Sequence, residues 1–381
     1  MRAIPPLVRA ATVALGLAVM VPGGAHAVTS GHPFIVNGER GEEGRYPFMA
    51  SLQYKGMDGS ARERHFCGGT LIDPEWVLTA AHCAEFLAAK DMTVIVGRTR
   101  LSSDQGESRD VAEIFVHPDW DSEVIAPDVA LLRLSAPVTG VTPLEPVRST
   151  ERALWEPGDP ATTIGWGLQN ESDRRPPDDL QTVDLPIQSD ETMSSPDVYG
   201  EEFLRADMLG AGPLDGGAGS CYGDSGGPLM VGDGAGRRQI GVVSWGGGCA
   251  VDHAPTVYSR VGEGRIRSFL DAHIPLRIAD VRTPEREAAT FVLSLSRPST
   301  LPVSVTYTTV AVTATSGTDF TPAAGTLTIP AGATTATVRV PVTEDTVPER
   351  DETLRLTVTS LGNAVAGDTS AIAIILDDDL T

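Results

Sequence analysis

The stretch Gly223-Asp224-Ser225-Gly226-Gly227-Pro228 is the feature on which the interpretation of this 381-residue sequence depends. A serine between glycines can occupy a tight turn, and the backbone N–H groups of Gly223 and Ser225 can then converge on one negatively charged oxygen. A serine hydroxyl is a poor nucleophile until an imidazole accepts its proton and a carboxylate holds that imidazole. The stretch therefore predicts a partner histidine and a partner acid elsewhere in the chain.

Two other segments supply candidate partners for Ser225. Leu78-Thr79-Ala80-Ala81-His82-Cys83 contains a histidine, and Asp128-Val129-Ala130-Leu131-Leu132 contains an acid. Taken singly, His82 also fits a buried core histidine, and Asp128 fits a surface or capping acid. Together with Ser225 they form the set that nucleophilic catalysis needs. An esterase of the nucleophile-elbow type is excluded, because its serine motif and the chain order of its three residues differ.

Composition places the chain among acidic globular proteins. Glycine and proline, at 40 and 28 residues, stay below the share typical of low-complexity chains, and hydrophobic residues make up 41%. The net charge of −22 repels phosphate backbones and anionic membranes, so we expect no nucleic acid partner. The length predicts two domains.

The N-terminus is typical of a secretory signal peptide. Arg2 and Arg9 form a basic start, and the run from Ala10 to Val21 is uncharged. Ala25-His26-Ala27 then matches a cleavage site. The uncharged run is shorter than the roughly 20 residues of a membrane helix, so no membrane span is expected. We predict a signal peptide over residues 1–27 and a secreted protein, in which the four cysteines can form two disulfides.

Hydrophobic patterning divides the remaining chain into two β-rich parts. Short apolar runs such as Ile240–Trp245, separated by Gly, Pro and Asp, predict a barrel or sandwich. A helical pattern over Gly264–Ile274 ends at Pro275. After Leu276 cysteine and tryptophan are absent, and apolar residues alternate as in Phe291–Leu295, which predicts an antiparallel sandwich.

Residues from about 35 to 275 resemble the trypsin/chymotrypsin-like serine protease family. The three segments above carry the resemblance, together with Ile35-Val36-Asn37-Gly38, Gly165-Trp166-Gly167 and Ser244-Trp245-Gly246. The resemblance implies an all-β double β-barrel with a C-terminal helix over residues 35–276. It implies a serine endopeptidase that acts on proteins or peptides without a catalytic cofactor. His82, Asp128 and Ser225 would be catalytic, and Gly223 and Ser225 would form the oxyanion hole.

The resemblance also implies maturation by cleavage. Residues 28–34 would be a propeptide, and the new α-amino group of Ile35 would pair with the carboxylate of Asp224. Phe34 stands where the family usually has Arg or Lys. Activation by a trypsin-like enzyme is therefore not expected, and self-cleavage after Phe34 is a hypothesis.

Small uncharged residues occupy the positions that form the substrate pocket in this family: Gly219, Ser220, Ser244, Gly246 and Thr256. Burying an unpaired Arg or Lys there would be costly, so apolar primary specificity is expected. Thr256 should make the pocket shallow and favour Leu, Met, Val or Ala. The family's cysteine positions imply the disulfides Cys67–Cys83 and Cys221–Cys249.

Residues 277–381 resemble the Calx-β domain family, an immunoglobulin-like β-sandwich. Gly317-Thr318-Asp319-Phe320 and Val347-Pro348-Glu349-Arg350-Asp351-Glu352 carry this resemblance. Calcium takes six to eight oxygen ligands, so carboxylates gathered at one end of a sandwich form a candidate site. The candidate ligands are Glu285, Asp319, Glu349, Asp377, Asp378 and Asp379, with Asp345 as an optional extra ligand. A solvated acidic end with a charged tail is the alternative.

A second function class remains open at this point. The chain could act as an adhesion or binding protein, with the sandwich docking to a surface or matrix partner and the protease fold serving as a scaffold. The complete set of His82, Asp128 and Ser225 favours the enzyme.

Overall fold

The structure, a computed structural model, describes residues 35–379. The predicted signal peptide 1–27 and propeptide 28–34 lie outside these residues. Strands dominate the described chain, which confirms the all-β class. No helix between residues 35 and 379 is long and apolar enough to span a membrane.

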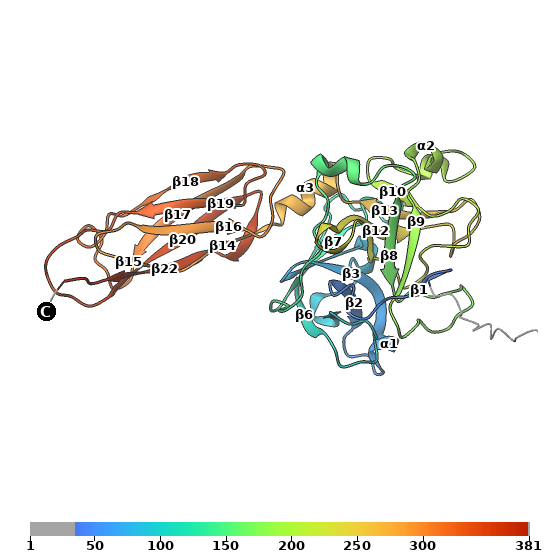
Figure 1. Ribbon diagram of the computed structural model, residues 1–381, viewed down its shortest axis with the longest axis horizontal. Coiled ribbons are helices and arrows are strands. Elements are labelled where there is room, and N and C mark those ends of the chain that lie inside the picture. Colours follow the sequence, from blue (N-terminus) through green and yellow to red (C-terminus); the bar gives the residue numbers. More distant parts are fainter. Residues whose placement is uncertain (1–34, 380–381) are drawn as a thin grey trace, which may run out of the picture. The chain divides into compact units, whose positions relative to one another are not determined.

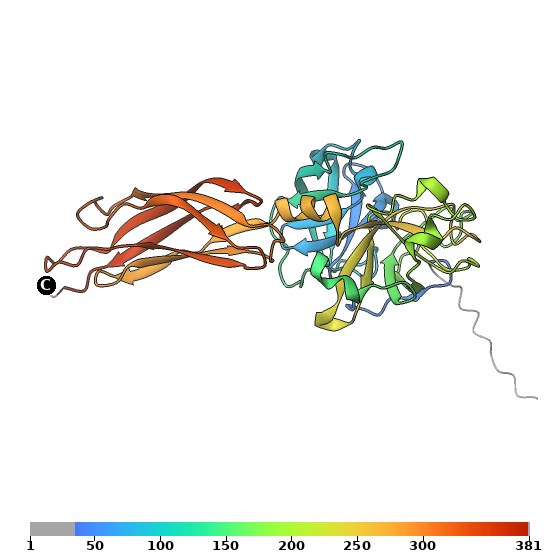
Figure 2. The ribbon, with the colours of Figure 1, turned by 90° about the horizontal axis from the view of Figure 1, so that it is seen from above.

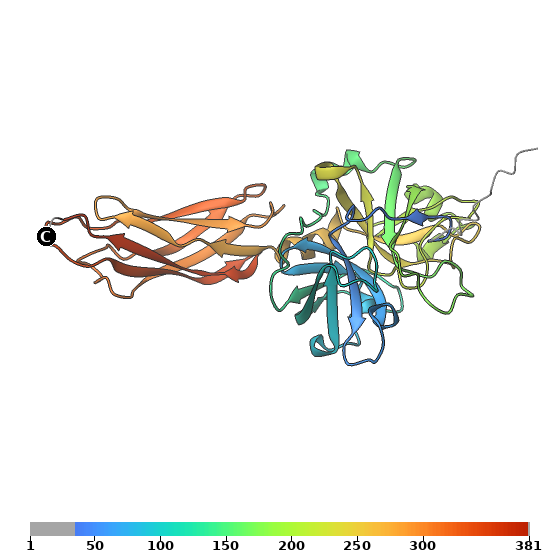
Figure 3. The same ribbon diagram turned by 60° about the horizontal axis from the view of Figure 1, so that its bottom comes forward.

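Six strands form a closed barrel in the first half of the protease domain (Figures 1 and 3). In barrel order they are β2 (Met49–Tyr54), β3 (His65–Asp73), β4 (Trp76–Thr79), β7 (Ala130–Leu134), β6 (Glu107–Val116) and β5 (Met92–Val96). All neighbouring strands are antiparallel. The barrel closes because apolar side chains such as Leu52, Leu71 and Leu78 are fully buried inside it.

The second sheet of the protease domain has seven strands and does not close. Its order is β1 (Glu39–Arg40), β9 (Gln181–Pro186), β8 (Pro160–Gly165), β11 (Pro228–Val231), β12 (Arg238–Trp245), β13 (Thr256–Arg260) and β10 (Met208–Ala211). This curled sheet takes the place of the second barrel in the expected fold. Ser225 lies in the turn that leads into β11.

Short helices fill the connections of this domain. They are α1 (Ala61–Arg64), η1 (Ala81–Cys83), η2 (Ala89–Asp91), η3 (Ser149–Leu154), α2 (Asp190–Met193), η4 (Gly200–Glu202) and η5 (Gly234–Gly236). The predicted C-terminal helix is α3 (Gly264–Ala272), which buries Ile266, Phe269 and Leu270. This confirms the helical pattern, with the end two residues earlier than expected.

The C-terminal part is a β-sandwich of two sheets (Figure 2). One sheet has the order β19 (Thr335–Val340), β16 (Ala289–Leu295), β14 (Pro275–Ile278) and β21 (Val365–Asp368). The other has the order β15 (Val281–Pro284), β22 (Ser370–Leu376), β20 (Glu352–Gly362), β17 (Val303–Ala311) and β18 (Ala324–Ile329). The first strand begins at Pro275, two residues before the boundary expected from the sequence.

The alternating pattern of the sandwich strands decides which side chains enter its core. Phe291, Leu293 and Leu295 of β16 are buried, while Val292 between them is exposed. Successive residues of a strand point to opposite faces, so each sheet presents one apolar face to the other. The predicted sandwich is confirmed.

Candidate active site

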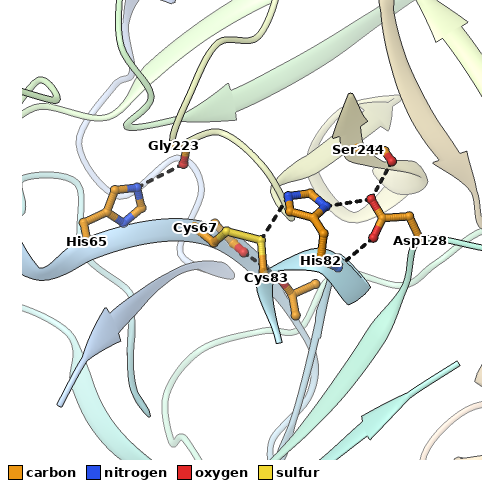
Figure 4. The surroundings of a disulfide bond; sticks show 9 residues. His65, Cys67, His82, Cys83, Asp128, Gly223 and Ser244 are labelled. Carbon is orange, nitrogen blue, oxygen red and sulfur yellow. Dashed lines mark hydrogen bonds and ion pairs between the residues drawn. A yellow bond between two sulfur atoms is a disulfide. The ribbon is translucent and has the colours of Figure 1, made fainter. Parts of the chain in front are cut away.

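His82 and Asp128 form the hydrogen-bonded pair at the centre of the site (Figure 4). The barrel strand β4 runs directly into the short helix η1, which carries His82. Nδ1 of His82 lies 2.8 Å from Oδ2 of Asp128, and the backbone N–H of His82 donates to Oδ1 at 3.0 Å. Two contacts from one residue fix the orientation of the imidazole against the carboxylate.

Asp128 is held by a second set of donors from the seven-stranded sheet. Ser244 Oγ donates to Oδ2 of Asp128 at 2.5 Å, and Ser259 Oγ donates to the backbone carbonyl of Asp128 at 2.7 Å. Asp128 is only 1% exposed. A buried carboxylate needs such partners to remain charged. Ser244, expected as a pocket residue, lines the cleft but also anchors this carboxylate.

The surroundings of His82 prepare it to hold a proton during a reaction. Burial alone would lower the pKa of His82. The hydrogen bond and charge of Asp128, together with the charge of Glu85, outweigh burial and raise this pKa above 6.5. With Nδ1–H held by Asp128, Nε2 of the neutral ring is free to accept a proton.

Ser225 and His82 line the same cleft, which has a volume of about 630 Å³. Nε2 of His82 lies 3.5 Å from Sγ of Cys83. Within residues 35–379 no hydrogen bond joins Nε2 to Ser225. Such contacts commonly tighten only when substrate binds.

The turn around Gly223 contains the two N–H groups expected to form the oxyanion hole. The N–H of Leu168 donates to the carbonyl of Tyr222 at 2.7 Å. The C=O and N–H of a trans peptide point in opposite directions, so the N–H of Gly223 faces away from Leu168. Gly223 has φ of +99°, a conformation that favours glycine. In the described chain, neither Gly223 N–H nor Ser225 N–H has an acceptor, which leaves both able to bind an oxyanion.

Asp224 lies buried directly behind this turn. Its carboxylate accepts hydrogen bonds from the N–H groups of Gly167 at 2.7 Å and Cys221 at 2.9 Å. Burial raises the pKa of Asp224 to about 7, and the two hydrogen bonds only partly oppose this rise. A Cβ on Gly167 would lie 2.4 Å from the Asp224 carboxylate, which explains the glycine there.

The first described residues run along the loop that precedes Ser225. Val36 forms a β-bridge with Gly219, and Asn37 Nδ2 donates to the carbonyl of Gly217 at 2.5 Å. Ile35 is fully buried. Within residues 35–379, no cation pairs with Asp224.

His65 is a site residue that the sequence did not reveal. It is 9% exposed, and its ring nitrogens lie 2.8 Å from Ser51 Oγ and 3.1 Å from the carbonyl of Gly223. Burial lowers the pKa of His65 to about 4, so the ring is neutral. No motif marks His65, because its role depends on a contact between residues 158 positions apart.

Within the described residues, no acidic or basic side chain other than that of His82 lines the cleft next to Ser225. Ser220, Ser244, Gly246 and Thr256 line the cleft, whereas Gly219 does not. Thr256 Oγ1 lies 3.1 Å from the place that a Cβ on Gly219 would occupy. Thr256 therefore lies directly beside Gly219, the residue expected at the floor of the pocket. No Asp, Glu, Lys or Arg lines this cleft.

Both disulfides brace the cleft. Cys67–Cys83 joins β3 to the helix that carries His82, and Cys221–Cys249 joins the Ser225 loop to the chain after β12. These are the two pairings implied by the cysteine positions. Closing loops of this size is worth roughly 3 kcal/mol each in the chain-entropy view.

The acidic residues of the sandwich gather in two groups. Glu285 lies with Asp345 and Asp379, and Asp319 lies with Glu349 and Glu352; the carboxylate oxygens within each group are within 4.8 Å of one another. Glu285 is only 8% exposed. Asp377 accepts from the N–H of Glu349 at 3.1 Å. Asp378 instead forms an ion pair with Arg286 and belongs to neither group.

The pKa values of these carboxyl groups show how crowded the charges are. Burial and the neighbouring acids raise the pKa of Glu285, Glu349 and Asp379. Burial and the hydrogen bond and charge of Asp319 raise that of Glu352 to about 7. Clustered oxygen donors that repel one another fit a divalent cation such as calcium.

Comparison with known proteins agrees with this geometry. The Trypsin family matches residues 35–266, and the Calx-beta domain matches residues 280–379. A protein called "Trypsin" from Saccharopolyspora erythraea is 40% identical over 228 residues, which cover 60% of this chain and 93% of that protein. The fold and site define a serine protease. The chain belongs to the trypsin family and carries a Calx-beta domain after the protease domain.

Proposed function

We propose that this chain is a secreted endopeptidase that cleaves peptide bonds through an acyl-enzyme on Ser225. The hydrogen-bonded pair of His82 and Asp128, in one uncharged cleft with Ser225, carries this proposal. Two disulfides and the N-terminal pattern support export to an oxidising compartment.

In the proposed reaction, His82 accepts the proton of Ser225 while the Oγ attacks the substrate carbonyl. The N–H groups of Gly223 and Ser225 bind the oxyanion that forms, and a donor of this kind is worth roughly 2.7–4 kcal/mol. His82 then gives its proton to the leaving amine, and water releases the acyl group by the reverse sequence.

Primary specificity for medium apolar side chains follows from the pocket. An Arg or Lys side chain would find no carboxylate among the lining residues, and Thr256 limits the depth. We expect cleavage after Leu, Met, Val or Ala. Peptide substrates that vary only in the residue before the scissile bond test this, and rapid cleavage after Arg would show the pocket assignment to be wrong.

A serine-directed fluorophosphonate probe separates the enzyme from a binding protein on a protease scaffold. The enzyme predicts covalent labelling of the wild-type chain and none of Ser225→Ala. An unlabelled wild-type chain with Ile35 at its N-terminus would favour the binding protein, in which the sandwich docks to a surface or matrix partner.

Activation is proposed to occur by cleavage after Phe34. Asp224 is buried with a raised pKa, and the chain from Ile35 already contacts the loop before Ser225, so a new ammonium group at Ile35 would give the carboxylate a partner. N-terminal sequencing of the active protein should begin at Ile35. Processing of Ser225→Ala at the same bond would exclude self-cleavage.

We also propose that the sandwich binds calcium through its two acidic groups. The low exposure of Glu285 and the raised pKa values of four carboxyl groups support this. Glu285, Asp345 and Asp379 would hold one ion, and Asp319, Glu349 and Glu352 another. Calcium would neutralise the crowded charges and stabilise that end of the sandwich.

A further inference from the structure

Four apolar side chains line the cleft on its barrel side: Tyr54, Phe66, Phe86 and Leu87, which we call the aromatic patch. Tyr54 ends β2, Phe66 lies in β3, and the other two follow η1. The proposed pocket residues Ser220, Gly246 and Thr256 belong instead to the chain of the seven-stranded sheet. The cleft therefore has two chemically distinct walls.

The aromatic patch offers apolar surface that nothing in the described chain covers. Phe86 is 86% exposed, and Tyr54 is 40% exposed. The ring of Tyr54 stacks on that of Phe66, with centroids 4.3 Å apart and planes at 29°. Binding becomes more favourable when an apolar group of a ligand covers exposed aromatic surface in a cleft.

The position of the aromatic patch relative to His82 decides which part of a substrate it meets. Phe66 precedes Cys67, Phe86 follows Cys83 by three residues, and the Cys67–Cys83 disulfide lies beside His82. Figure 4 shows this disulfide on the edge of the imidazole opposite Asp128. His82 gives its proton to the leaving amine. The residue that carries this amine therefore lies next to the disulfide and the aromatic patch.

We propose that the aromatic patch selects a large apolar side chain on the residue after the scissile bond, with Phe86 as its main specificity-determining residue. This inference rests on the proposed function. No lining residue carries a charge that would pair with an acidic or basic side chain there. At the Phe34–Ile35 bond of this chain, the residue after the scissile bond is Ile35, a large apolar residue.

Acyl transfer to added amines isolates this side of the cleft. An ester of blocked leucine first acylates Ser225, and an amino acid amide then competes with water. The amine nitrogen bonds to the acyl carbon, the bond from this carbon to Ser225 Oγ breaks, and His82 transfers the amine proton to Oγ. The acyl group is constant, so the choice of amine reports only on the leaving-group side.

The expected result is a preference of at least about tenfold for phenylalanine amide over glycine amide, since about 1.4 kcal/mol of ring burial is a factor of ten. Phe86→Ala should lower this ratio at least fivefold, and Phe86→Leu should retain most of it. Tyr54→Ala is the second variant. Leu154→Ala is the matched control, because Leu154 is 46% exposed and does not line the cleft.

The possible outcomes distinguish failure of the aromatic patch proposal from failure of the proposed protease function. Equal partition of the two amides in the wild type, or a ratio unchanged in both Phe86→Ala and Tyr54→Ala, overturns the role of the aromatic patch. Absence of an initial burst of alcohol from the ester shows that no acyl-enzyme accumulates with this donor. If the fluorophosphonate probe also fails to label Ser225, the proposed function falls and this inference falls with it.

Discussion

Asp128 is buried, and its two carboxylate oxygens accept hydrogen bonds from different parts of the chain. Oδ1 accepts from the backbone of His82, while Oδ2 is shared by the ring of His82 and the hydroxyl of Ser244. All of these contacts require an acceptor. The side-chain amide of an asparagine at this position has one oxygen and one NH₂ group, so the NH₂ group would face at least one of these donors.

The substitution Asp128→Asn should therefore lower kcat by about 10⁴-fold, because an amide NH₂ facing Nδ1 stabilises the wrong tautomer of His82. The wild-type kcat/KM should rise with pH through a value above 6.5, since the raised pKa of His82 must be exceeded to free the base. Initial rates from pH 5 to 9 measure both effects. Ser244→Ala keeps the carboxylate and serves as the control; a loss as large as that of Asp128→Asn would contradict this argument.

Thr256 is the residue proposed to limit the depth of the specificity pocket. Its Oγ1 lies 3.1 Å from the place that a Cβ on Gly219 would take, and it accepts from the N–H of Ser220 at 3.3 Å. Thr256→Gly should open that space and raise kcat/KM for Phe relative to Val at least about tenfold, since one or two extra buried methylene equivalents are worth roughly 1–3 kcal/mol. Matched peptide substrates measure the ratio. An unchanged ratio would show that Thr256 does not limit the pocket.

At the scale of elements, the proposed maturation should change stability through the loop that contains Asp224. In a chain that still begins at Val28, the nitrogen of Ile35 is part of a peptide bond and cannot pair with Asp224 as an ammonium group. Within residues 35–379 no cation contacts this carboxylate, and its folded pKa of about 7 lies above the ordinary value of 3.8. The folded state then binds more protons than the unfolded state. Stability should fall as the pH rises from about 4 to 7, by on the order of 4 kcal/mol.

A chain that begins at Ile35 should lack this loss, because its ammonium group keeps Asp224 ionised. Both forms can be prepared with Ser225→Ala to prevent self-cleavage. All five tryptophans precede residue 277, so tryptophan fluorescence follows unfolding of the protease domain alone. Equal pH dependence of the two urea midpoints would contradict the pairing.

Local sequence patterns predicted much of this architecture, and contacts between distant residues account for what they missed. The alternation in Phe291–Leu295 and the apolar spacing of α3 follow from local periodicity. Closure of the first barrel depends on β2 pairing with β5, which lies about 40 residues later in the chain, and no local pattern encodes this contact. His65 in the site and Glu352 in its acidic group emerged only when the fold brought distant residues together.

At the scale of the whole molecule, added calcium should stabilise the folded sandwich, whereas a rise in pH without calcium should destabilise it. The pKa values of its clustered acids are raised, to about 7 for Glu352, so ionisation of these acids destabilises the folded state relative to the unfolded state. Without calcium, sandwich stability should therefore fall as the pH rises from about 4.5 to 7. Calcium binds the ionised carboxylates, so its stabilising effect should be larger at pH 7.5 than at pH 5.5.

Calorimetry of the full chain carrying Ser225→Ala tests this with calcium and with EDTA. Calcium at 100 times its dissociation constant adds about 2.7 kcal/mol, which should appear as a higher Tm of the transition that lacks a tryptophan signal. Glu285→Gln combined with Glu352→Gln should remove most of this shift, because each acidic group loses a carboxylate. Asp368→Asn, an exposed acid outside both groups, is the control. A Tm that millimolar calcium leaves unchanged at pH 7.5 would show that the acidic end is only solvated.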